Sequence, residues 1–566
     1  MQTSVAVTEK QGHLGLVRLQ WVFRGFIAVC ALIDCWFARF QNNPDGVSYM
    51  DMGDQYWRGN WHAALNSYWS PLYGWLTELP LRLMRPTIRW EYPAIHLMNF
   101  AVFLVTLICF EFFWRALLAV GKENARAGAS HFYKWTLGYL LFICMYLGSR
   151  ELEGVGADFL VATLVYLVFG MMLRFSAGRA GTLTAALLGV TLGVGYLAKA
   201  AMLPFSIVVL VTLLVVVRKR PSGMRLTAVA LLGFLMISTP YIAVLSWNCH
   251  RFTIGDAGRL NYAWSVNRPT TMHLHWQGDG GASAPPQHST RRILNWPEVY
   301  EFATPITGTY PVWYDPAYWW AGVDTKPHPV RQIAALLHNL GKIMNYLLRA
   351  IGALTTVVLM TFLLSGRVKD CSRQFIKFWP ILIPTIAVFL MYAMITWLSR
   401  YTTGVMLAGF GALIASTSIS GEKKQTLVLQ AASLTLGVMV AVMVLQSMYQ
   451  NHHDMEYWEQ QVELAEQLRT MGIEPGERVA IIGSGLDESS WARLDRVEIV
   501  AEVTQTQESG DSVTAFWNAS PEVQVAVLNA LKSTGARAVV SIIPPRALAP
   551  GWVPLKNTGH AIIFFR

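Results

Sequence analysis

Charged residues are scarce in this chain. Of its 566 residues only 14% are Asp, Glu, Lys or Arg, whereas 53% are hydrophobic, and the mean hydropathy is +0.35. A soluble domain of this length carries more charge, because its surface must stay in water. The composition therefore excludes an ordinary soluble protein and indicates a polytopic membrane protein.

Cysteine is also rare, and its positions exclude two kinds of site. The six cysteines show neither the paired spacing of a zinc site nor the density of a disulfide framework.

A removable signal peptide is not expected either, because a polar stretch of about twenty residues precedes the first apolar run and no small-residue cleavage site follows it closely. We expect the first span to remain as an uncleaved anchor.

Long apolar runs predict the membrane-spanning segments. Spans need roughly 17 to 25 predominantly apolar residues, and eleven candidates meet this criterion. They are about residues 22–40, 95–118, 134–149, 156–174, 182–198, 201–217, 226–246, 344–365, 378–398, 401–418 and 426–447. The fold class predicted is a polytopic α-helical membrane protein.

Basic residues fall in every second connection between these spans. Cytoplasmic loops retain Lys and Arg, so this alternation predicts a cytoplasmic amino terminus and an extracytoplasmic carboxyl terminus. These basic loops, which also attract anionic lipid headgroups, account for much of the net charge of +10. No nucleic-acid partner is needed to explain that charge. The basic connections contain Lys10, Arg18, Arg24, Lys122, Arg126, Lys134, Arg174, Arg179, Arg218, Lys219, Arg220, Arg225, Arg367, Lys369, Arg373, Lys377, Lys423 and Lys424.

Three long segments should face outward: residues 41–94, 247–343 and 449–566. Residues 449–566 alternate apolar strand-like runs with helical stretches, which predicts a small extracytoplasmic α/β accessory domain, and leaves 1–448 as the membrane domain. An amphipathic helix is expected near 453–471. The Gly483-Ser484-Gly485 turn departs from a nucleotide-binding spacing, and we interpret it as a strand-to-helix turn.

The segment 247–343 is dense in aromatic residues, above all between Tyr310 and Trp320. Trp and Tyr can stack on sugar rings, but they also settle at a lipid headgroup layer, and both interpretations stay open. His273 and His275 could share one face of a strand as metal ligands, although no third ligand lies at a supporting spacing.

Asp45 is the leading candidate for a catalytic carboxylate. It lies in Asn43-Pro44-Asp45-Gly46-Val47-Ser48-Tyr49, directly after the first span, and a carboxylate at the edge of a bilayer calls for a functional explanation. The alternative is a helix cap for a helix from Val47 to Arg58. Asp51 and Asp54 follow one helical turn apart and share a face, where they could assist or be merely solvated, and Arg58 could pair with Asp54 or turn toward a phosphate.

A second acidic cluster is expected on the same side. The connection after the third span contains Glu151, Glu153 and Asp158. Facing Asp45, these carboxylates could hold a divalent cation such as Mg²⁺ or Mn²⁺ against a phosphate, or orient an acceptor. The other interpretation is a short charged loop, so metal dependence stays undecided.

Lys199 and Arg400 break the alternation of basic loops, because both lie at the outward ends of spans. A cation on that side needs a partner. A lipid phosphate is one such partner, and Arg can hold it through two hydrogen bonds. Snorkelling to the headgroup layer is the alternative.

Taken together, these residues resemble the GT-C superfamily of membrane glycosyltransferases, specifically bacterial members related to protein O-mannosyltransferases and to lipid A aminoarabinose transferase. The resemblance covers about residues 20–420. Members typically carry an Asp, often Asp-Glu, just beyond the first span. The matching features here are Asp45, Ser70-Pro71-Leu72-Tyr73, Asp158 at the entry of the fourth predicted span, the Gly195-to-Lys199 ending of the fifth, and Arg400-Tyr401. Gly46 departs from the pattern, because it replaces the acidic second residue.

The resemblance implies a periplasmic active site in a bacterial inner-membrane enzyme that transfers a sugar from a polyprenyl phosphate to an extracytoplasmic protein, lipid or glycan. Asp45 would be the general base, with Asp51, Asp54 and Asp158 as further catalytic candidates. Lys199, Arg400, Tyr401 and Arg58 would bind the donor phosphate. Acceptor and sugar contacts would come from Tyr49, Tyr68, Trp69, Tyr73, Glu151 and Glu153. A transporter or flippase of lipid-linked saccharides and a non-catalytic scaffold are the alternative classes.

Overall fold

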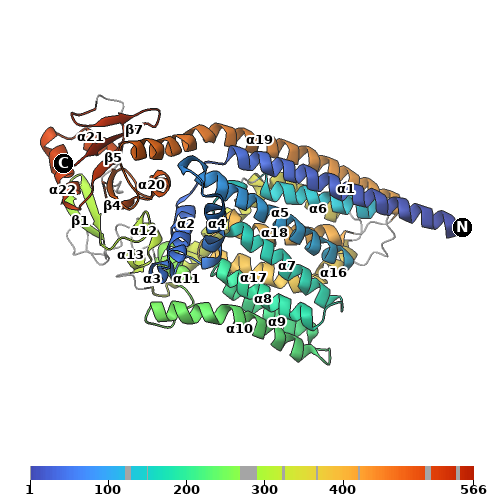
Figure 1. The fold of residues 1–566 in the computed structure, drawn as a ribbon. Coiled ribbons are helices and arrows are strands. Elements are labelled where there is room, and N and C mark those ends of the chain that lie inside the picture. The colour runs from blue at the N-terminus through green and yellow to red at the C-terminus, as the bar shows by residue number, and fades with distance from the viewer. Residues whose placement is uncertain are drawn as a thin grey trace.

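A helical bundle with a β-sheet at one end makes up the molecule, and the two chain termini lie at opposite ends (Figure 1). The computed structural model describes residues 2–120, 129–148, 151–267, 290–320, 325–364, 368–417, 421–503, 512–543 and 548–565. His273 and His275 lie outside the described residues, so the metal interpretation of this pair stays a prediction.

Each of the eleven apolar segments predicted from the sequence coincides with helical structure. The bundle consists of α1 (Gln2–Phe37), α5 (Ile88–Val120), α6 (Ala129–Tyr146), α7 (Asp158–Ser176), α8 (Thr182–Ala198), α9 (Met202–Val217), α10 (Gly223–Asn248), α14 (Pro329–Asn345), α15 (Gly352–Leu363), α16 (Val368–Ile376), α17 (Trp379–Met394), α18 (Ser399–Ser416) and α19 (Glu422–Thr470).

Fewer helices meet a stricter test for crossing a membrane. Within the described ranges, five are long and apolar enough, and the number rises to seven if two sharply bent helix pairs each count as one span. Shorter apolar helices, α8 and α9, lie beside them. The chain is thus a multi-pass helical membrane protein, while the count of about eleven spans stays a prediction.

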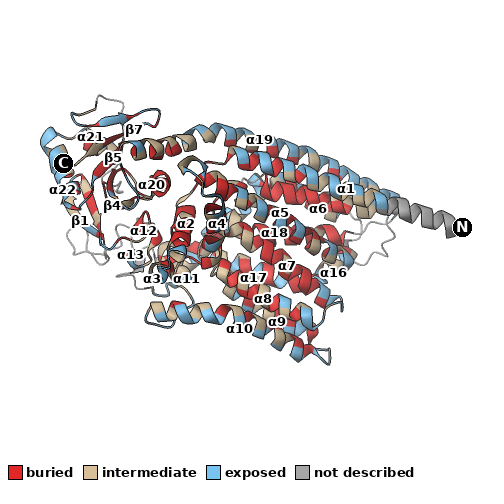
Figure 2. Ribbon diagram, viewed as in Figure 1, coloured by how far each residue is buried: buried red, intermediate tan, exposed pale blue. Residues whose placement is uncertain are grey.

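The centre of the bundle is closely packed. Buried residues dominate α6, α7 and α18, whereas α1, α10 and α19 keep exposed faces (Figure 2). Trp114 of α5 is fully buried between Gly138 and Gly411. A Cβ atom at Gly138 would lie 2.4 Å from the Trp114 ring, so small residues let these helices approach, as is common inside membranes.

Short helices cover the end of the bundle that carries the sheet. They are α2 (Pro44–Trp57), α3 (Trp61–Ala64), α4 (Pro71–Met84), the 3₁₀ turn Glu151–Glu153, α11 (Ala257–Tyr262), the π-helical turn Ala263–Asn267, α12 (Pro311–Tyr314) and α13 (Ala317–Trp320). The start of α2 follows from its sequence: the Asn43 side chain accepts a hydrogen bond from the Gly46 amide at 2.7 Å, and Pro44 occupies the first turn.

The sheet has seven strands in the order β1-β2-β4-β3-β5-β7-β6. Its three central strands are parallel and the outer ones antiparallel. The strands are β1 (Thr290–Asn295), β2 (Glu298–Phe302), β3 (Arg478–Ile482), β4 (Glu498–Val503), β5 (Ala538–Ile542), β6 (Val553–Leu555) and β7 (His560–Phe564), with helices α20 (Ser489–Asp495), α21 (Ser512–Trp517) and α22 (Pro521–Ser533).

Two features of the sheet differ from the separate C-terminal domain that the sequence predicts. β1 and β2 come from the middle segment of the chain, and β2 pairs with β4, so the sheet is shared with the C-terminal residues. The expected boundary at residue 449 falls inside α19, which continues for 49 residues from the bundle to the sheet. The separate amphipathic helix expected at 453–471 is the second half of this helix.

Candidate active site

Four charged residues from distant parts of the chain form one cluster at the sheet end of the bundle. Oδ2 of Asp45 lies 2.9 Å from Nη2 of Arg400, and Oδ2 of Asp158 lies 3.5 Å from Nε of the same arginine. The second oxygen of Asp158 accepts a hydrogen bond from Lys199. The chain Asp45–Arg400–Asp158–Lys199 alternates in charge and has no net charge.

Ends of four helices supply this charged cluster. Asp45 lies in the first turn of α2, Asp158 begins α7, Arg400 lies in the first turn of α18, and Lys199 is the residue that ends α8. The positive end of a helix dipole disfavours a cation such as Arg400. Two carboxylates compensate for this cost, and each of the four side chains keeps between 18% and 36% of its surface exposed.

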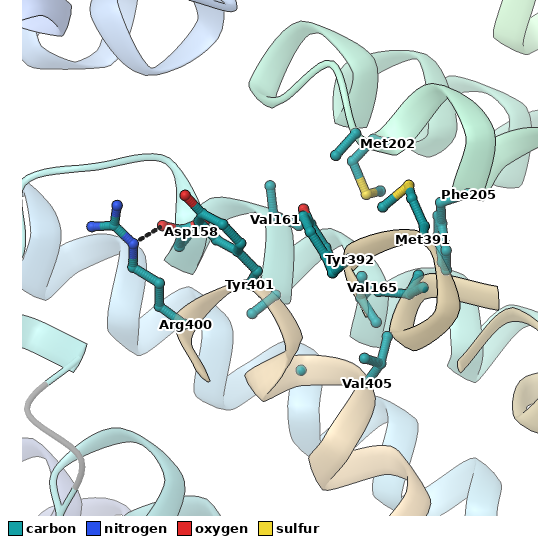
Figure 3. Close-up of a pocket in the computed structure, with 14 residues that line it drawn as sticks. Asp158, Val161, Val165, Met202, Phe205, Met391, Tyr392, Arg400, Tyr401 and Val405 are labelled. Atoms are coloured by element: carbon teal, nitrogen blue, oxygen red, sulfur yellow. Dashed lines mark ion pairs between the residues drawn. The ribbon is translucent and has the colours of Figure 1, made fainter. Parts of the chain in front are cut away.

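Beside the cluster lies a narrow pocket among α7, α9, α17 and α18. Asp158, Arg400 and Tyr401 form its polar part, and Val161, Val165 and Phe205 are among its apolar walls (Figure 3). Such a combination suits a ligand with a charged end and a hydrocarbon end.

Tyr401 connects the charges to the apolar wall. The Lys199 ammonium lies 3.9 Å from the centre of the Tyr401 ring, a cation–π contact. Packing also holds this ring, because Tyr401 stacks on Tyr392 with ring centres 4.9 Å apart. The ring is therefore fixed on the side of the cluster where Lys199 lies.

Aromatic residues predicted from the first loop gather in the same region. Tyr49 packs edge-on against Trp69 and Tyr73, with ring centres 5.2 and 5.1 Å away. Tyr68 contacts Trp69 in turn. Tyr49, Trp69 and Tyr73 are buried, and in this conformation they pack together where α2 meets the start of α4. Their predicted contacts to a sugar or an acceptor stay predictions.

Trp313 of α12 contacts Asp45, and the sequence alone did not identify this contact. Its Nε1 donates a hydrogen bond to Oδ1 of Asp45 at 3.2 Å, while Arg400 holds the other oxygen. The Trp313 ring stacks on Trp264 with centres 6.0 Å apart. The aromatic density between Tyr310 and Trp320 was the only available signal.

Asp51 and Asp54 belong to a different cluster of contacts. Their partner is Arg493 of α20, which is 1% exposed and lies 3.0 Å from Asp51, 2.9 Å from Asp54 and 3.1 Å from Glu91. Arg82 and Arg496 complete this network. The structure therefore does not bring Asp51 and Asp54 into contact with Asp45; it places them where α2 meets the C-terminal residues.

Environment separates the pKa values of these two carboxyl groups. Burial raises the pKa of Asp51 to about 6, although Arg493 and hydrogen bonds from Thr309 oppose the rise. Burial acts in the same direction on Asp54, but its arginine neighbours outweigh it and hold the pKa below its ordinary value. Arg58 lines a polar pocket of about 160 Å³ with these two residues, apart from Lys199 and Arg400.

A strap of residues 306–314 connects the sheet to both carboxylate clusters. The Thr309 amide and hydroxyl donate to Asp51 at 2.6 and 3.0 Å, and the Ile499 amide of β4 donates to the Thr309 carbonyl at 3.0 Å. The Tyr310 hydroxyl donates to Glu502 at 3.0 Å. The strap then leads to Trp313 and Asp45, so the position of the sheet bears on the first cluster.

Gly46 has a steric reason to lack a side chain. A Cβ atom at this position would lie 2.2 Å from Oδ1 of Asn42 and 2.6 Å from Cβ of Val155. An acidic residue after Asp45 would displace both neighbours. The helix-cap alternative for Asp45 is also wrong, because Asn43 is the cap and α2 begins before Asp45.

The remaining acidic candidates lie just before α7. Glu151 and Glu153 form a short 3₁₀ turn, and Glu153 is partly buried. Their predicted roles with an acceptor or a metal stay predictions. Among the residues that the structure describes, no group of three or more His, Cys, Asp or Glu side chains could hold a metal ion.

Comparison with known proteins bears on the fold. No family model matches the sequence, and no curated protein sequence matches it either. Among solved structures, ArnT from Cupriavidus metallidurans in the apo state is 14% identical with a TM-score of 0.53, over 93% of each chain. The same enzyme bound to undecaprenyl phosphate is 13% identical with a TM-score of 0.53, over 96% of this chain and 98% of that one.

The class that the fold defines is therefore a multi-pass helical membrane protein. In particular, its arrangement of helices and sheet is similar to that of ArnT over nearly the whole length of both chains. This confirms, at the level of the fold, the resemblance drawn from the sequence.

Proposed function

We propose that this protein is an integral-membrane glycosyltransferase that takes a sugar from a polyprenyl phosphate and transfers it to an acceptor outside the cytoplasm. The observation that carries the proposal is the contact between Asp45 and Arg400, within a cluster that also holds Asp158 and Lys199. A carboxylate and two cations beside a pocket with apolar walls are the groups that such a transfer requires. The fold of ArnT, a protein crystallised with undecaprenyl phosphate, adds support.

In the proposed reaction, Asp45 accepts the proton of the acceptor hydroxyl or amine. The freed electron pair attacks the anomeric carbon from the side opposite the phosphate, and the bond between that carbon and the phosphate oxygen breaks. The configuration at the anomeric carbon is thereby inverted. Negative charge grows on the departing polyprenyl phosphate, so cations positioned there stabilise the transition state more than the bound substrate.

Arg400 and Lys199 are the proposed phosphate ligands, and Tyr401 holds Lys199 in place. Arg400 is paired with Asp45 and Asp158. A phosphate oxygen competes for the same guanidinium, so donor binding releases Asp45 to act as a base. Asp158 lies between the two cations and is a positioning residue in this scheme. Asp51 and Asp54 serve the contact with the C-terminal residues rather than the proton transfer.

The side of the membrane follows from the basic loops. Together with the cluster at the sheet end, they support a bacterial inner-membrane protein with a cytoplasmic amino terminus, a carboxyl terminus outside and about eleven spans. The sugar and the acceptor remain open within this class, and a divalent ion such as Mg²⁺ or Mn²⁺ has no assigned residues.

Turnover of a labelled donor tests the proposal. Purified protein with a polyprenyl-phosphate sugar and an extract of envelope acceptors should release free polyprenyl phosphate. Asp45→Asn should lower that release by at least about a hundredfold, the size of a lost general base. Asp487→Asn is the matched control, because Asp487 is an exposed carboxylate in the turn between β3 and α20.

Two results would contradict the proposal. Full activity in folded Asp45→Asn would remove the proposed base. Movement of intact labelled donor across a vesicle membrane without release of polyprenyl phosphate would instead identify a transporter.

A further inference from the structure

A second cavity lies where α1, the end of α4 and the start of α5 meet. Its volume is about 500 Å³, within the usual range of small-molecule sites, roughly 300–1,000 Å³. It shares no lining residue with the pocket beside Asp158. We call it the α1–α5 groove, and its proposed occupant does not depend on the proposed glycosyltransferase activity.

The groove opens toward the membrane. Its rim includes large apolar side chains that are about half exposed, one at the end of α4 and the others on α1 and α5, which are long and apolar enough to span a bilayer. Exposed apolar groups at that level face hydrocarbon chains rather than water. These rim residues are Leu32 (52%), Trp36 (53%), Met84 (56%), Trp90 (52%) and Leu97 (50%).

Arg39 places a single cation in this apolar wall. Its guanidinium lies 4.5 Å from the centre of the Trp36 ring and 4.4 Å from that of Phe40. It donates hydrogen bonds to the Trp36 carbonyl and to the Met455 sulfur, and neither neutralises its charge. Among the described residues no carboxylate forms an ion pair with Arg39, and Glu459 in its vicinity is paired with Arg89.

His96 adds a hydrogen-bond acceptor to the same wall. Its Nε2 donates to the Gln41 carbonyl at 2.9 Å, which leaves Nδ1 as an acceptor. The side chain is 1% exposed and lines the groove, and Nδ1 receives no hydrogen bond from any residue that the structure describes. A buried polar atom without a partner is costly, so a ligand with a donor group gains by reaching it.

We propose that the α1–α5 groove is a binding site for an anionic phospholipid with a hydroxyl-bearing headgroup, of the phosphatidylglycerol type. The acyl chains lie along the apolar wall and the phosphodiester pairs with Arg39. A zwitterionic choline lipid carries its own cation, which competes with Arg39 for the phosphate. Charge complementarity therefore selects the anionic lipid.

Native mass spectrometry of the full-length protein in detergent tests this site. Equal amounts of phosphatidylglycerol and phosphatidylcholine are offered, and the first bound lipid is counted. We expect wild type to favour phosphatidylglycerol and Arg39→Gln to lose roughly tenfold of that preference, as for a lost charge-assisted contact. Arg85→Gln is the matched control, because Arg85 is exposed, precedes the groove residue Pro86 and does not line the groove.

A second variant keeps the test decisive if Arg39→Gln folds poorly. Leu97→Trp fills the groove from a half-exposed rim position and should reduce binding of the first phosphatidylglycerol severalfold while the unfolding temperature stays unchanged. Equal binding of both lipids to wild type would overturn the proposal, as would equal loss in Arg39→Gln and Arg85→Gln. Displacement of phosphatidylglycerol by polyprenyl phosphate would assign the groove to that lipid instead.

Discussion

Arg400 lies 2.9 Å from Asp45 although 355 residues separate them along the chain. The proposed base is therefore paired with the proposed phosphate ligand. Under the proposed function a donor phosphate competes with Asp45 for this guanidinium, so donor binding weakens the contact that holds the base.

This competition predicts opposite effects of two substitutions on donor affinity. Asp45→Asn removes a rival anion, so polyprenyl phosphate should bind roughly two- to fivefold more tightly, as expected for a partly exposed ion pair. Arg400→Gln should weaken binding by at least about tenfold. Equilibrium binding of labelled polyprenyl phosphate measures both effects. Weaker binding by Asp45→Asn would refute the competition.

Trp313 is expected to position Asp45 without touching the donor. Trp313→Phe keeps a stacking ring but removes the hydrogen bond to Oδ1, so kcat should fall roughly two- to tenfold, the worth of one ordinary hydrogen bond. KM for the donor should stay unchanged. Steady-state kinetics separate the two parameters, and Trp247→Phe, at a position 83% exposed on α10, is the control. A rise in KM alone would assign Trp313 to substrate binding.

Arg493 should be a main determinant of stability. Arg493→Met leaves Asp51, Asp54 and Glu91 buried without their shared cation, which costs about 3–5 kcal/mol for a broken buried pair. The unfolding temperature of the purified protein should fall clearly. Arg291→Met provides the comparison, because Arg291 is 68% exposed in its pair with Glu301 and should contribute little. Equal shifts in the two variants would show that the network adds no stability.

Glu502 predicts a dependence of stability on pH. Burial raises the pKa of this carboxyl group from 4.5 to about 7, against hydrogen bonds from Gly485 and Tyr310. The folded protein therefore holds the proton more tightly than the unfolded chain. Stability is greatest below about pH 4.5 for this group and declines as pH rises toward 7.

The comparison with Glu502→Gln isolates this effect. The amide mimics the protonated acid at all pH values, so the variant should gain unfolding temperature relative to wild type as pH rises from 5 to 8. Melting curves at both pH values measure the difference. A difference that is independent of pH would show that Glu502 does not titrate as described.

The helices of the bundle could be predicted because each apolar run is long enough to form its own backbone hydrogen bonds in a membrane. Asp45, Lys199 and Arg400 could be singled out for a similar reason, since a charge at the edge of an apolar run has a high cost. The sequence did not show which of these charged groups pair with one another. Only the folded structure places Asp158 between the two cations.

Other parts of the structure have no recognisable signal in the nearby sequence. Arg493 lies in the sequence Ala-Arg-Leu-Asp-Arg, which is typical of an exposed helix, yet it is 1% exposed because α20 packs on α2. Strands β1 and β2 follow a stretch rich in Pro and Gly, and they acquire their role through pairing with β4. Such long-range contacts depend on the whole fold, and one sequence does not record them.

The unbroken helix α19 restricts how the site can open. At 1.5 Å per residue its 49 residues extend about 74 Å, well beyond the roughly 30 Å of a hydrocarbon core. A turn at residues 471–477 then joins the end of this helix to β3. We expect a bulky acceptor to reach Asp45 by displacing the strap 306–314, because Trp313 in this strap contacts that carboxylate.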